Sequence, residues 1–480
     1  IKWPTNPIRY LGIYISNTMI ECETLNWTSK LEKMQKLLDS WRLRRLTLQG
    51  KITVIKTLAI PKLVYTASFL PIPKDFIKNV NRILYKFIWN KNEKIKRTVL
   101  INVFEKGGLK MIDIETHTLA LKASWIPRIF DDCNNVWAYL GRSYINKATG
   151  GLLKHMNLTN KKQFPRLEIV PEFYQEVVIG YCKANLPNKI ITKCDLYNQV
   201  LWGNRQLQCH DKCLYSQSFI DDGYIFVKDI LQNDGKIKSN LYDNLTSKQQ
   251  YLRTISMIQY ALRPFKYLRF YQDDEINEND ENVAIHNNKC KWFYAELLQP
   301  KAVKAKAIKH WIDYFEIDTE WNQVYSNKMK NQLEMKIAEF NYKLINNILP
   351  TGCNLFKWNK VPDESCIYCE EKCHDTKHLL LQCPHLKKLW TFVSGVIHEN
   401  ITWQIIVLGT NDKDYVNSII SLICFIIYKK FLLDRNQNAV KYLPMLTFVK
   451  KEIAFRLKTY RELEFTLAVR IYLESLLEAL

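Results

Sequence analysis

The sequence lacks the features that mark secreted and membrane proteins. Its thirteen cysteines are odd in number and follow no regular spacing, which argues for a reducing compartment and against a disulfide-stapled secreted protein. Its most apolar run, Ile419 to Tyr428, is about ten residues long, short of the roughly twenty that span a bilayer, and predicts a buried helix. No apolar leader follows Ile1, which is not an initiator Met. We therefore expect a piece of a longer intracellular protein, cytoplasmic and nuclear and not secreted.

Negative charge is also scarce. The chain has 69 Lys and Arg against 48 Asp and Glu, a formal net charge of +21. Residues 1–130 hold 23 of the basic residues and 9 of the acidic ones, a net charge of +14 in about a quarter of the chain. This excess predicts a polyanionic partner. Because aromatic residues make up 12% of the sequence and supply stacking faces, nucleic acid is favoured over a membrane surface.

Hydrophobic periodicity predicts a mainly α fold. At 480 residues, 47% of them hydrophobic, the chain is long enough for roughly two to four units with real cores. Apolar residues recur at helical spacing over 27–41, after Thr47 and after Pro73, which predicts a small helical bundle. Residues 9–16 are rich in β-branched and aromatic residues and predict one strand. A fourth helix is expected after the turn at Gly107-Gly108.

One stretch places several metal ligands at ligand-like spacing. Two residues separate Cys366 from Cys369, and His378 and Cys383 follow in the pattern Cys-x2-Cys-x8-His-x4-Cys. The short gap lets a tight turn aim both thiolates at one ion, and the later pair completes a tetrahedron around Zn²⁺. Four protein ligands leave no open position for a catalytic water, so the predicted zinc is structural. Three neighbours leave the ligand register open: Cys373, His374 and His385.

We expect five segments along the chain. The first holds the last strand of a sheet, the second a basic helical bundle, and the third a helical or mixed connector. The fourth is a helix followed by the small zinc knuckle, and the fifth is a set of C-terminal helices. In that order the segments cover residues 1–20, 21–130, 131–330, 331–400 and 401–480. The connector has the weakest periodicity, because prolines interrupt short apolar stretches.

Two basic clusters stand near the ends of predicted helices. One runs from Arg42 to Lys51 and the other from Lys91 to Arg97. A single lysine in such a run is usually part of a solvated helix face. Taken together, the two clusters predict contacts with the phosphates of a nucleic acid backbone.

A short acidic motif has a polymerase-like pattern in the wrong context. Tyr271-Gln-Asp-Asp274 matches the Tyr-x-Asp-Asp signature with which reverse transcriptases hold two metal ions. That signature works in a hairpin between apolar strands, whereas a polar, acidic run follows it here. We therefore predict that its aspartates are not catalytic. Cys209, His210 and Cys213 lack a second ligand pair and are expected to be ordinary side chains.

A series of short motifs runs along nearly the whole chain. The earlier ones are Arg9-Tyr-Leu-Gly-Ile13, Gly50-Lys51-Ile52, Ile60-Pro61-Lys62-Leu63, Pro71-Ile-Pro73, Lys86-Phe-Ile-Trp89-Asn90 and Gly107-Gly108-Leu109. The later ones are Pro171-Glu-Phe-Tyr174, Leu201-Trp202, Phe340-Asn-Tyr342-Lys343, Ile348-Leu349-Pro350 and the knuckle with Leu389-Trp390 after it. In order and spacing, the series resembles LINE-type (non-LTR) retrotransposon reverse transcriptases, from the thumb to the C-terminal Cys-Cys-His-Cys zinc region.

The resemblance implies a fragment of an RNA-directed DNA polymerase. The family's palm, with its metal-binding aspartates, lies upstream of the matched region. The family's endonuclease has no counterpart in this sequence, because Asp412 and Asp414 lack the Pro-Asp sequence context of that module. We therefore expect a catalytically inert chain.

The family's thumb grips the backbone of template and primer, which implies where this chain would touch RNA or an RNA/DNA hybrid. Six residues are the expected phosphate contacts: Arg44, Arg45, Lys51, Lys94, Lys96 and Arg97. Lysines around the knuckle would add RNA contacts: Lys372, Lys377, Lys387 and Lys388.

Two alternatives stay open on the sequence alone. In one, the chain is a degenerate remnant of such an element, and its helices only pack or bind protein partners. In the other, it retains polymerase or nuclease activity through Asp273 and Asp274.

Overall fold

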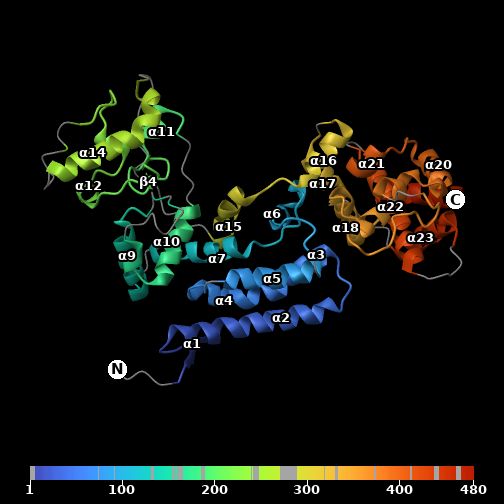
Figure 1. Ribbon diagram of the computed structural model, residues 1–480, viewed down its shortest axis with the longest axis horizontal. Helices are drawn as coiled ribbons and strands as arrows, with labels where there is room; N and C mark the ends of the chain where they lie inside the picture. Colours follow the sequence, from blue (N-terminus) through green and yellow to red (C-terminus); the bar gives the residue numbers. More distant parts are fainter. Residues whose placement is uncertain are drawn as a thin grey trace. The chain divides into compact units, whose positions relative to one another are not determined.

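The computed structural model is mainly α-helical, with two small two-stranded sheets among the residues it describes (Figure 1). The predicted fold class is confirmed. The described residues are 6–73, 75–90, 92–130, 135–153, 156, 158, 166–184, 190–238, 241, 248–270, 289–317, 319–329, 333–371, 375–410, 413–436, 443–460 and 466–480. The Tyr271-Gln-Asp-Asp274 motif, Lys91 and Asp412 lie outside them.

The chain divides into two compact units. The first comprises Ile1–Lys36, Ala59–Arg82 and Asp113–Lys301, and the second comprises Leu37–Leu58, Ile83–Ile112 and Ala302–Leu480. The segment boundaries expected at residues 20, 130, 330 and 400 stay predictions.

Residues 9–16 form a hairpin and not the single strand that their composition predicts. β1 (Ile8–Tyr10) pairs antiparallel with β2 (Ile13–Ile15). The reversal occurs at Leu11 and Gly12, whose φ angles are +47° and +82°. Two successive residues with positive φ make the tight turn that joins hairpin strands, and glycine adopts this conformation without steric cost. Composition alone missed the turn because Leu11 is a residue that rarely adopts it.

The first unit is built mostly of short helices. Its elements after the hairpin are α1 (Met19–Glu23), η1 (Thr24–Thr28), α4 (Pro61–Phe69), α7 (Ile114–Ala123), α8 (Trp125–Phe130), α9 (Val136–Thr149), η5 (Leu167–Ile169), α10 (Glu172–Ala184), α11 (Lys193–Tyr197), β3 (Gln208–Cys209), β4 (Lys212–Cys213), α12 (Gln217–Asp221), α13 (Val227–Ile230), α14 (Lys248–Leu262), η7 (Arg263–Phe270), α15 (Cys290–Leu298) and η9 (Gln299–Lys301). Three elements extend across a boundary of the units: α2 (Ser29–Arg42), η2 (Ile55–Ala59) and α5 (Phe76–Trp89).

Helix α7 is the packing centre of the first unit, where it contacts α4, α10 and α15. Its Lys122 is buried, and Nζ donates to the Leu70 carbonyl at 2.8 Å and pairs with Glu176 at 3.1 Å. Burial lowers the pKa of Lys122, and the Glu176 carboxylate opposes part of that shift. Trp202, from the Leu201-Trp202 motif, is fully buried and donates its indole N–H to the Tyr224 carbonyl.

The second unit carries the longer helices. Its elements are α3 (Leu48–Val54), α6 (Arg97–Leu100), η3 (Phe104–Lys106), α16 (Lys306–Phe315), α17 (Trp321–Met329), α18 (Met335–Ile345), α19 (Gly352–Lys357), η10 (His378–Gln382), η11 (Pro384–Leu386), α20 (Lys387–Ile397), α21 (Trp403–Leu408), α22 (Asp414–Asn436), α23 (Met445–Thr459) and α24 (Leu467–Ala479). The helix expected after Thr47 is α3, and the Thr47 side chain caps it by accepting from the Gly50 N–H at 3.1 Å.

Helix α22 is the centre of the second unit, surrounded by α18, α21, α23 and α24 (Figure 1). The Ile419–Tyr428 run lies within it and is buried, as predicted, although the helix has 23 residues. Asp414–Arg435 is long and apolar enough to cross a membrane, but 78% of its most apolar stretch is buried inside the structure. This degree of burial is typical of a helix in the core of a folded protein.

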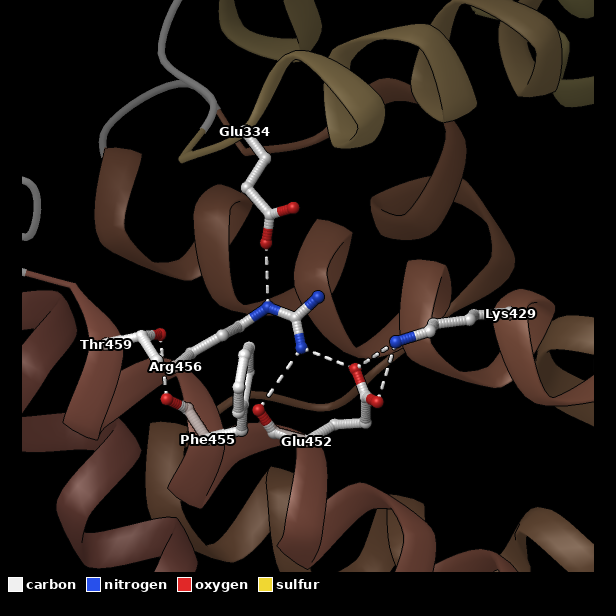
Figure 2. A network of polar contacts seen from close by, with 6 residues as sticks. All are labelled: Glu334, Lys429, Glu452, Phe455, Arg456 and Thr459. Atoms are coloured by element: carbon white, nitrogen blue, oxygen red, sulfur yellow. Dashed lines mark hydrogen bonds and ion pairs between the residues drawn. The ribbon is translucent and has the colours of Figure 1, made fainter. Parts of the chain in front are cut away.

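A buried ion network ties three helices of this core together (Figure 2). Arg456 on α23 is 5% exposed and donates to Glu334, the N-cap residue of α18, and to Glu452, both at 2.7 Å. Lys429 on α22 donates to both carboxylate oxygens of Glu452. Burial alone would raise the pKa of Glu452, but the bonds from Lys429 and Arg456 outweigh it, and the pKa is lowered.

Two glycines allow a close backbone approach in the second unit. A Cβ on Gly108 would lie 2.0 Å from the Asn102 carbonyl oxygen. Gly107 has φ +75°, and a Cβ there would lie 2.7 Å from the Tyr325 ring. The Gly107-Gly108 turn that the sequence predicts before a helix is therefore also a packing requirement.

Candidate metal centre

The first two candidate ligands lie in a tight turn after α19. The Cys366 N–H donates to the Glu371 carbonyl, and the Glu370 N–H donates to the Cys366 carbonyl, both at 2.9 Å. Glu370 closes the turn in the left-handed region, with φ +63°. The turn brings Cys366 and Cys369 together, as the two-residue gap predicts.

The second pair comes from the π-helical turn η10. Leu379 and Leu380 on this turn are buried in the core, which anchors it. The Asp375 carboxylate accepts from the His378 N–H at 2.6 Å, and the Cys383 N–H donates to the His378 carbonyl at 2.9 Å. His378 and Cys383 are thereby held at the two ends of one turn.

The four side chains converge. One ligand atom from each of Cys366, Cys369, His378 and Cys383 lies within 4.8 Å of the other three. Cys369 is partly buried and the other three are buried, so water has little access. Three sulfurs and one imidazole nitrogen are a donor set that suits Zn²⁺ in a closed tetrahedral site. We call residues 366–383 the zinc knuckle.

The sequence left open whether one of three neighbouring residues replaces a ligand, and the structure describes one of the three. Cys373 and His374 lie outside the described residues, as does Lys372. His385 is described and is not part of the converging group; its ring lies 6.2 Å from that of Tyr368.

The electrostatics of the cluster favour a cation. Hydrogen bonding with Cys366 is the main cause that raises the pKa of Cys383, and burial adds to it. Burial is also the main cause that raises the pKa of Cys369. Cys369 and Cys383 therefore resist losing their protons on their own, and a divalent cation would supply the charge that stabilises the thiolates.

A carboxylate orients the histidine. His378 Nδ1 lies 3.0 Å from Glu371 Oε2, and Nε2 lies 3.3 Å from the Cys369 sulfur. In the tautomer that donates from Nδ1 to Glu371, the Nε2 lone pair faces the sulfurs. A carboxylate on the second nitrogen is the usual partner of a metal-binding histidine, because it fixes ring orientation and raises basicity.

The knuckle is also tied to the helix core. The Tyr368 hydroxyl, inside the Cys-x2-Cys turn, donates to Asp434 on α22 at 2.7 Å. Asp434 in turn pairs with Lys430 at 2.6 Å, and both side chains are over 90% buried. Burial and the bond to Asp434 raise the pKa of Tyr368, so its hydroxyl stays a donor at neutral pH.

Of the three phosphate contacts predicted in the first basic cluster, two are exposed and one is already bonded. Arg44 stacks over Trp41 at 4.3 Å, and Arg45 is exposed. Lys51 is half-buried, donates to the Ile88 carbonyl at 2.9 Å, and has its pKa lowered by burial. A phosphate contact by Lys51 would have to replace that bond.

The second cluster lines a pocket of about 340 Å³. Lys94, Lys96 and Lys306 line it together with Glu93, although Lys306 stands over 200 positions later in the sequence than the other three. Burial lowers the pKa of Lys94, and nearby Lys343 adds to the shift; its Nζ lies 3.9 Å from the Trp358 ring centre. We call Lys94, Lys96 and Lys306 the lysine pocket.

Two other predicted contacts have protein partners. Arg97 pairs with Glu93 and stacks over the Tyr85 ring at 4.4 Å. Lys377, on the knuckle, donates to the Tyr314 hydroxyl at 3.1 Å. Arg97 is exposed and Lys377 is partly buried, and their contacts with nucleic acid stay predictions.

Comparison with known proteins agrees with this geometry. Residues 306–390 match a family described as zinc-binding in reverse transcriptase. This stretch is similar to the zinc-binding region of reverse transcriptases. It contains all four converging ligands and Lys306. The resemblance to the C-terminal zinc region of non-LTR retrotransposon reverse transcriptases is confirmed.

A relative supports the same origin for a larger part of the chain. Over 210 residues the chain is 23% identical to the "Transposon TX1 uncharacterized 149 kDa protein" of Xenopus laevis. The match covers 42% of this chain and 16% of that protein.

Sequence reasoning missed the residues that support the site. Glu371 is one of several acidic residues near the ligands, and no spacing rule singles it out. Asp434 is 66 residues from Tyr368, so no local pattern could have paired them. Lys306 opens an amphipathic helix and would be assigned to its solvated face.

Proposed function

We propose that the chain is the nucleic-acid-holding part of a retrotransposon reverse transcriptase. In this proposal one structural Zn²⁺, held by Cys366, Cys369, His378 and Cys383, folds the knuckle. The second unit holds template RNA or an RNA/DNA hybrid by its phosphates. When bound, the ion would supply folding energy and no chemistry, because its four protein ligands leave no open position.

The observation that carries the proposal is the lysine pocket. Three lysines from two distant segments line one pocket, and one of them, Lys306, lies in the stretch that matches a zinc-binding region of reverse transcriptases. The pocket also adjoins the start of α16, whose first turn has no acidic residue and no side-chain cap. The N-terminal end of a helix and cations on one surface favour phosphate oxygens.

A salt titration tests this proposal. We expect the full chain to bind an RNA/DNA hybrid with an affinity that falls steeply as salt rises, because bound phosphates release counterions. The double variant Lys94→Ala/Lys96→Ala should bind more weakly and with a shallower salt slope. The matched control is Lys450→Ala/Lys451→Ala on α23, which removes the same charge from exposed lysines away from the pocket.

Two results would contradict the proposal. One is a salt slope near zero, or no binding at low salt, for the unaltered chain. The other is an equal loss of affinity in the two double variants, which would mean that only net charge matters.

A further inference from the structure

A second pocket of the second unit plays no part in the sites above. Its volume is about 440 Å³, and it is formed by the loop around η3, the segment before α16, and the start of α17. Its polar, charged and aromatic lining residues are Asn102, Glu105, Lys106, Lys304, Thr319, Trp321 and Asn322. We call it the Trp321 pocket.

Trp321 has an unused donor at this pocket. Its indole Nε1 is buried and, among the described residues, has no hydrogen-bond partner. The side chain as a whole is only partly buried, and its ring lies 6.0 Å from the Tyr325 ring. Buried donors in proteins are nearly always bonded, so a donor left over at a pocket wall indicates a group that the pocket receives.

The rest of the lining combines apolar side chains, one carboxylate (Glu105) and two lysines. The Asn102 amide donates to the Val303 carbonyl at 2.8 Å, which fixes one wall. Lys106 and Lys304 are exposed at the rim. The pocket thus offers an aromatic ring, a free N–H and two cations within one small volume, together with the hydroxyl and amide groups of Thr319 and Asn322.

The Trp321 pocket and the lysine pocket are neighbours along one segment. Ala302 to Lys304 line the first, and Ala305 to Ala307 line the second. A strand whose phosphates occupy the lysine pocket would therefore pass close to the Trp321 pocket.

We infer that the Trp321 pocket receives one unpaired nucleotide of a single-stranded RNA next to the backbone contacts. This inference rests on the proposed function and adds a subsite to it. The indole face stacks on the base, and the Nε1–H donates to a ribose or phosphate oxygen of the same nucleotide. Lys106 and Lys304 face the flanking phosphates. A base inside a duplex is stacked and paired, so it cannot enter, and the pocket distinguishes single from double strands.

Binding of two labelled oligonucleotides tests the inference on the full chain. The probes are a 12-nucleotide single-stranded RNA carrying one 2-aminopurine and a fully paired RNA/DNA hybrid of the same length. Trp321→Leu should weaken single-strand binding about tenfold, the size of one lost base–aromatic stack, and leave hybrid binding within twofold. Its salt slope should be unchanged, because the substitution removes no positive charge.

Two further variants guard against a folding effect. Trp321→Phe keeps a stacking ring and should retain most of the 2-aminopurine quenching seen with the unaltered chain. Trp137→Leu removes a tryptophan that is 45% exposed on the first unit and should change neither probe.

The outcomes separate this inference from the proposed function. If the hybrid binds with a steep salt slope but Trp321→Leu leaves single-strand binding unchanged, the pocket is not a base site and the proposed function stands. An equal loss on both probes, or no quenching of 2-aminopurine by the unaltered chain, also overturns the inference. If neither probe binds the unaltered chain, both the inference and the proposed function fail.

Discussion

The zinc knuckle and the helix core around α22 belong to the same unit but are stabilised by different forces. In the core, Ile419, Ile423, Ile426 and other apolar side chains are fully buried, so the hydrophobic effect dominates. In the knuckle, Glu371 is 63% exposed and the shape depends on four converging ligands and the Tyr368 bond to Asp434. The core should therefore survive changes that destroy the knuckle.

Removing the metal should have the largest effect, and a local one. Zinc binding to structural sites is worth on the order of 10 kcal/mol of folding free energy, so a chelator should unfold the knuckle. We expect amide hydrogen exchange to rise sharply over residues 362–390 while α22 stays protected. The measurement is exchange followed by mass spectrometry, with and without chelator.

The matched control for this experiment is His385→Ala, since His385 lies beside the cluster but is not one of the converging ligands. It should leave exchange unchanged. Equal loss of protection in α22 and the knuckle would contradict the view that different forces stabilise them, because it would show that the core also depends on the metal.

Breaking the buried ion network should have the next largest effect, on the core alone. Arg456→Ala leaves Glu334 and part of Glu452 buried without their partner, which costs about 3–5 kcal/mol of unfolding free energy. Zinc content should not change. Arg456→Lys should recover only part of the loss, because an ammonium cannot contact both carboxylates with the geometry of a guanidinium.

The control is Arg470→Ala, which removes an exposed pair with Glu474 on α24 and should cost less than about 1 kcal/mol. Denaturant unfolding measures all three variants. A loss of zinc in Arg456→Ala would show that the two regions are coupled.

A buried lysine should give the core a characteristic pH dependence. Lys328 is 1% exposed, donates to the Ile406 carbonyl at 2.9 Å, and has its pKa lowered by burial to about 8. Between pH 8 and the ordinary value of 10.5 the unfolded chain holds this proton and the folded chain does not, so stability rises with pH. The contribution is at most about 3 kcal/mol.

The raised pKa of nearby Cys424 makes stability fall as the pH rises, which opposes the effect of Lys328. Because Lys328→Met keeps Cys424, the difference between the two proteins isolates the contribution of Lys328. The unfolding free energy of the unaltered chain minus that of the variant should increase from pH 8 to pH 10.5. A flat or falling difference would contradict the account of Lys328.

The smallest effect is expected at the carboxylate that orients His378. Glu371→Gln should lower zinc affinity about 10- to 100-fold, as for other outer partners of metal ligands, with little change in the stability of the zinc-loaded protein. Competition with a chelator measures the affinity, and the spectrum of the Co²⁺-substituted protein should shift. Glu364→Gln, a change at another acidic residue close in sequence, serves as the control.

The sequence was sufficient wherever local spacing decides the structure. The short gap between Cys366 and Cys369 dictates a tight turn, and the apolar period after Thr47 dictates a capped helix, so both were predictable. The hairpin at Leu11-Gly12 was not, because a leucine with positive φ contradicts its own propensity. The sequence also indicated an apolar run of about ten residues but not the full α22, whose polar ends lack periodicity.

Long-range partnerships could not be predicted. Lys306 joins Lys94 from over 200 positions away, and Asp434 reaches Tyr368 only because α22 packs beside the knuckle. Such pairs depend on tertiary packing, which a single sequence does not encode in any local pattern. The residues that line a pocket for nucleic acid could not be predicted for the same reason, because a pocket forms only when distant segments pack together.

The most direct test of the account is the zinc content of single variants, measured by native mass spectrometry on full chains purified without chelator. The account predicts one zinc in the unaltered chain and in Cys373→Ser, and none in Cys383→Ser. No zinc in the unaltered chain, or zinc kept by Cys383→Ser and lost by Cys373→Ser, would contradict it.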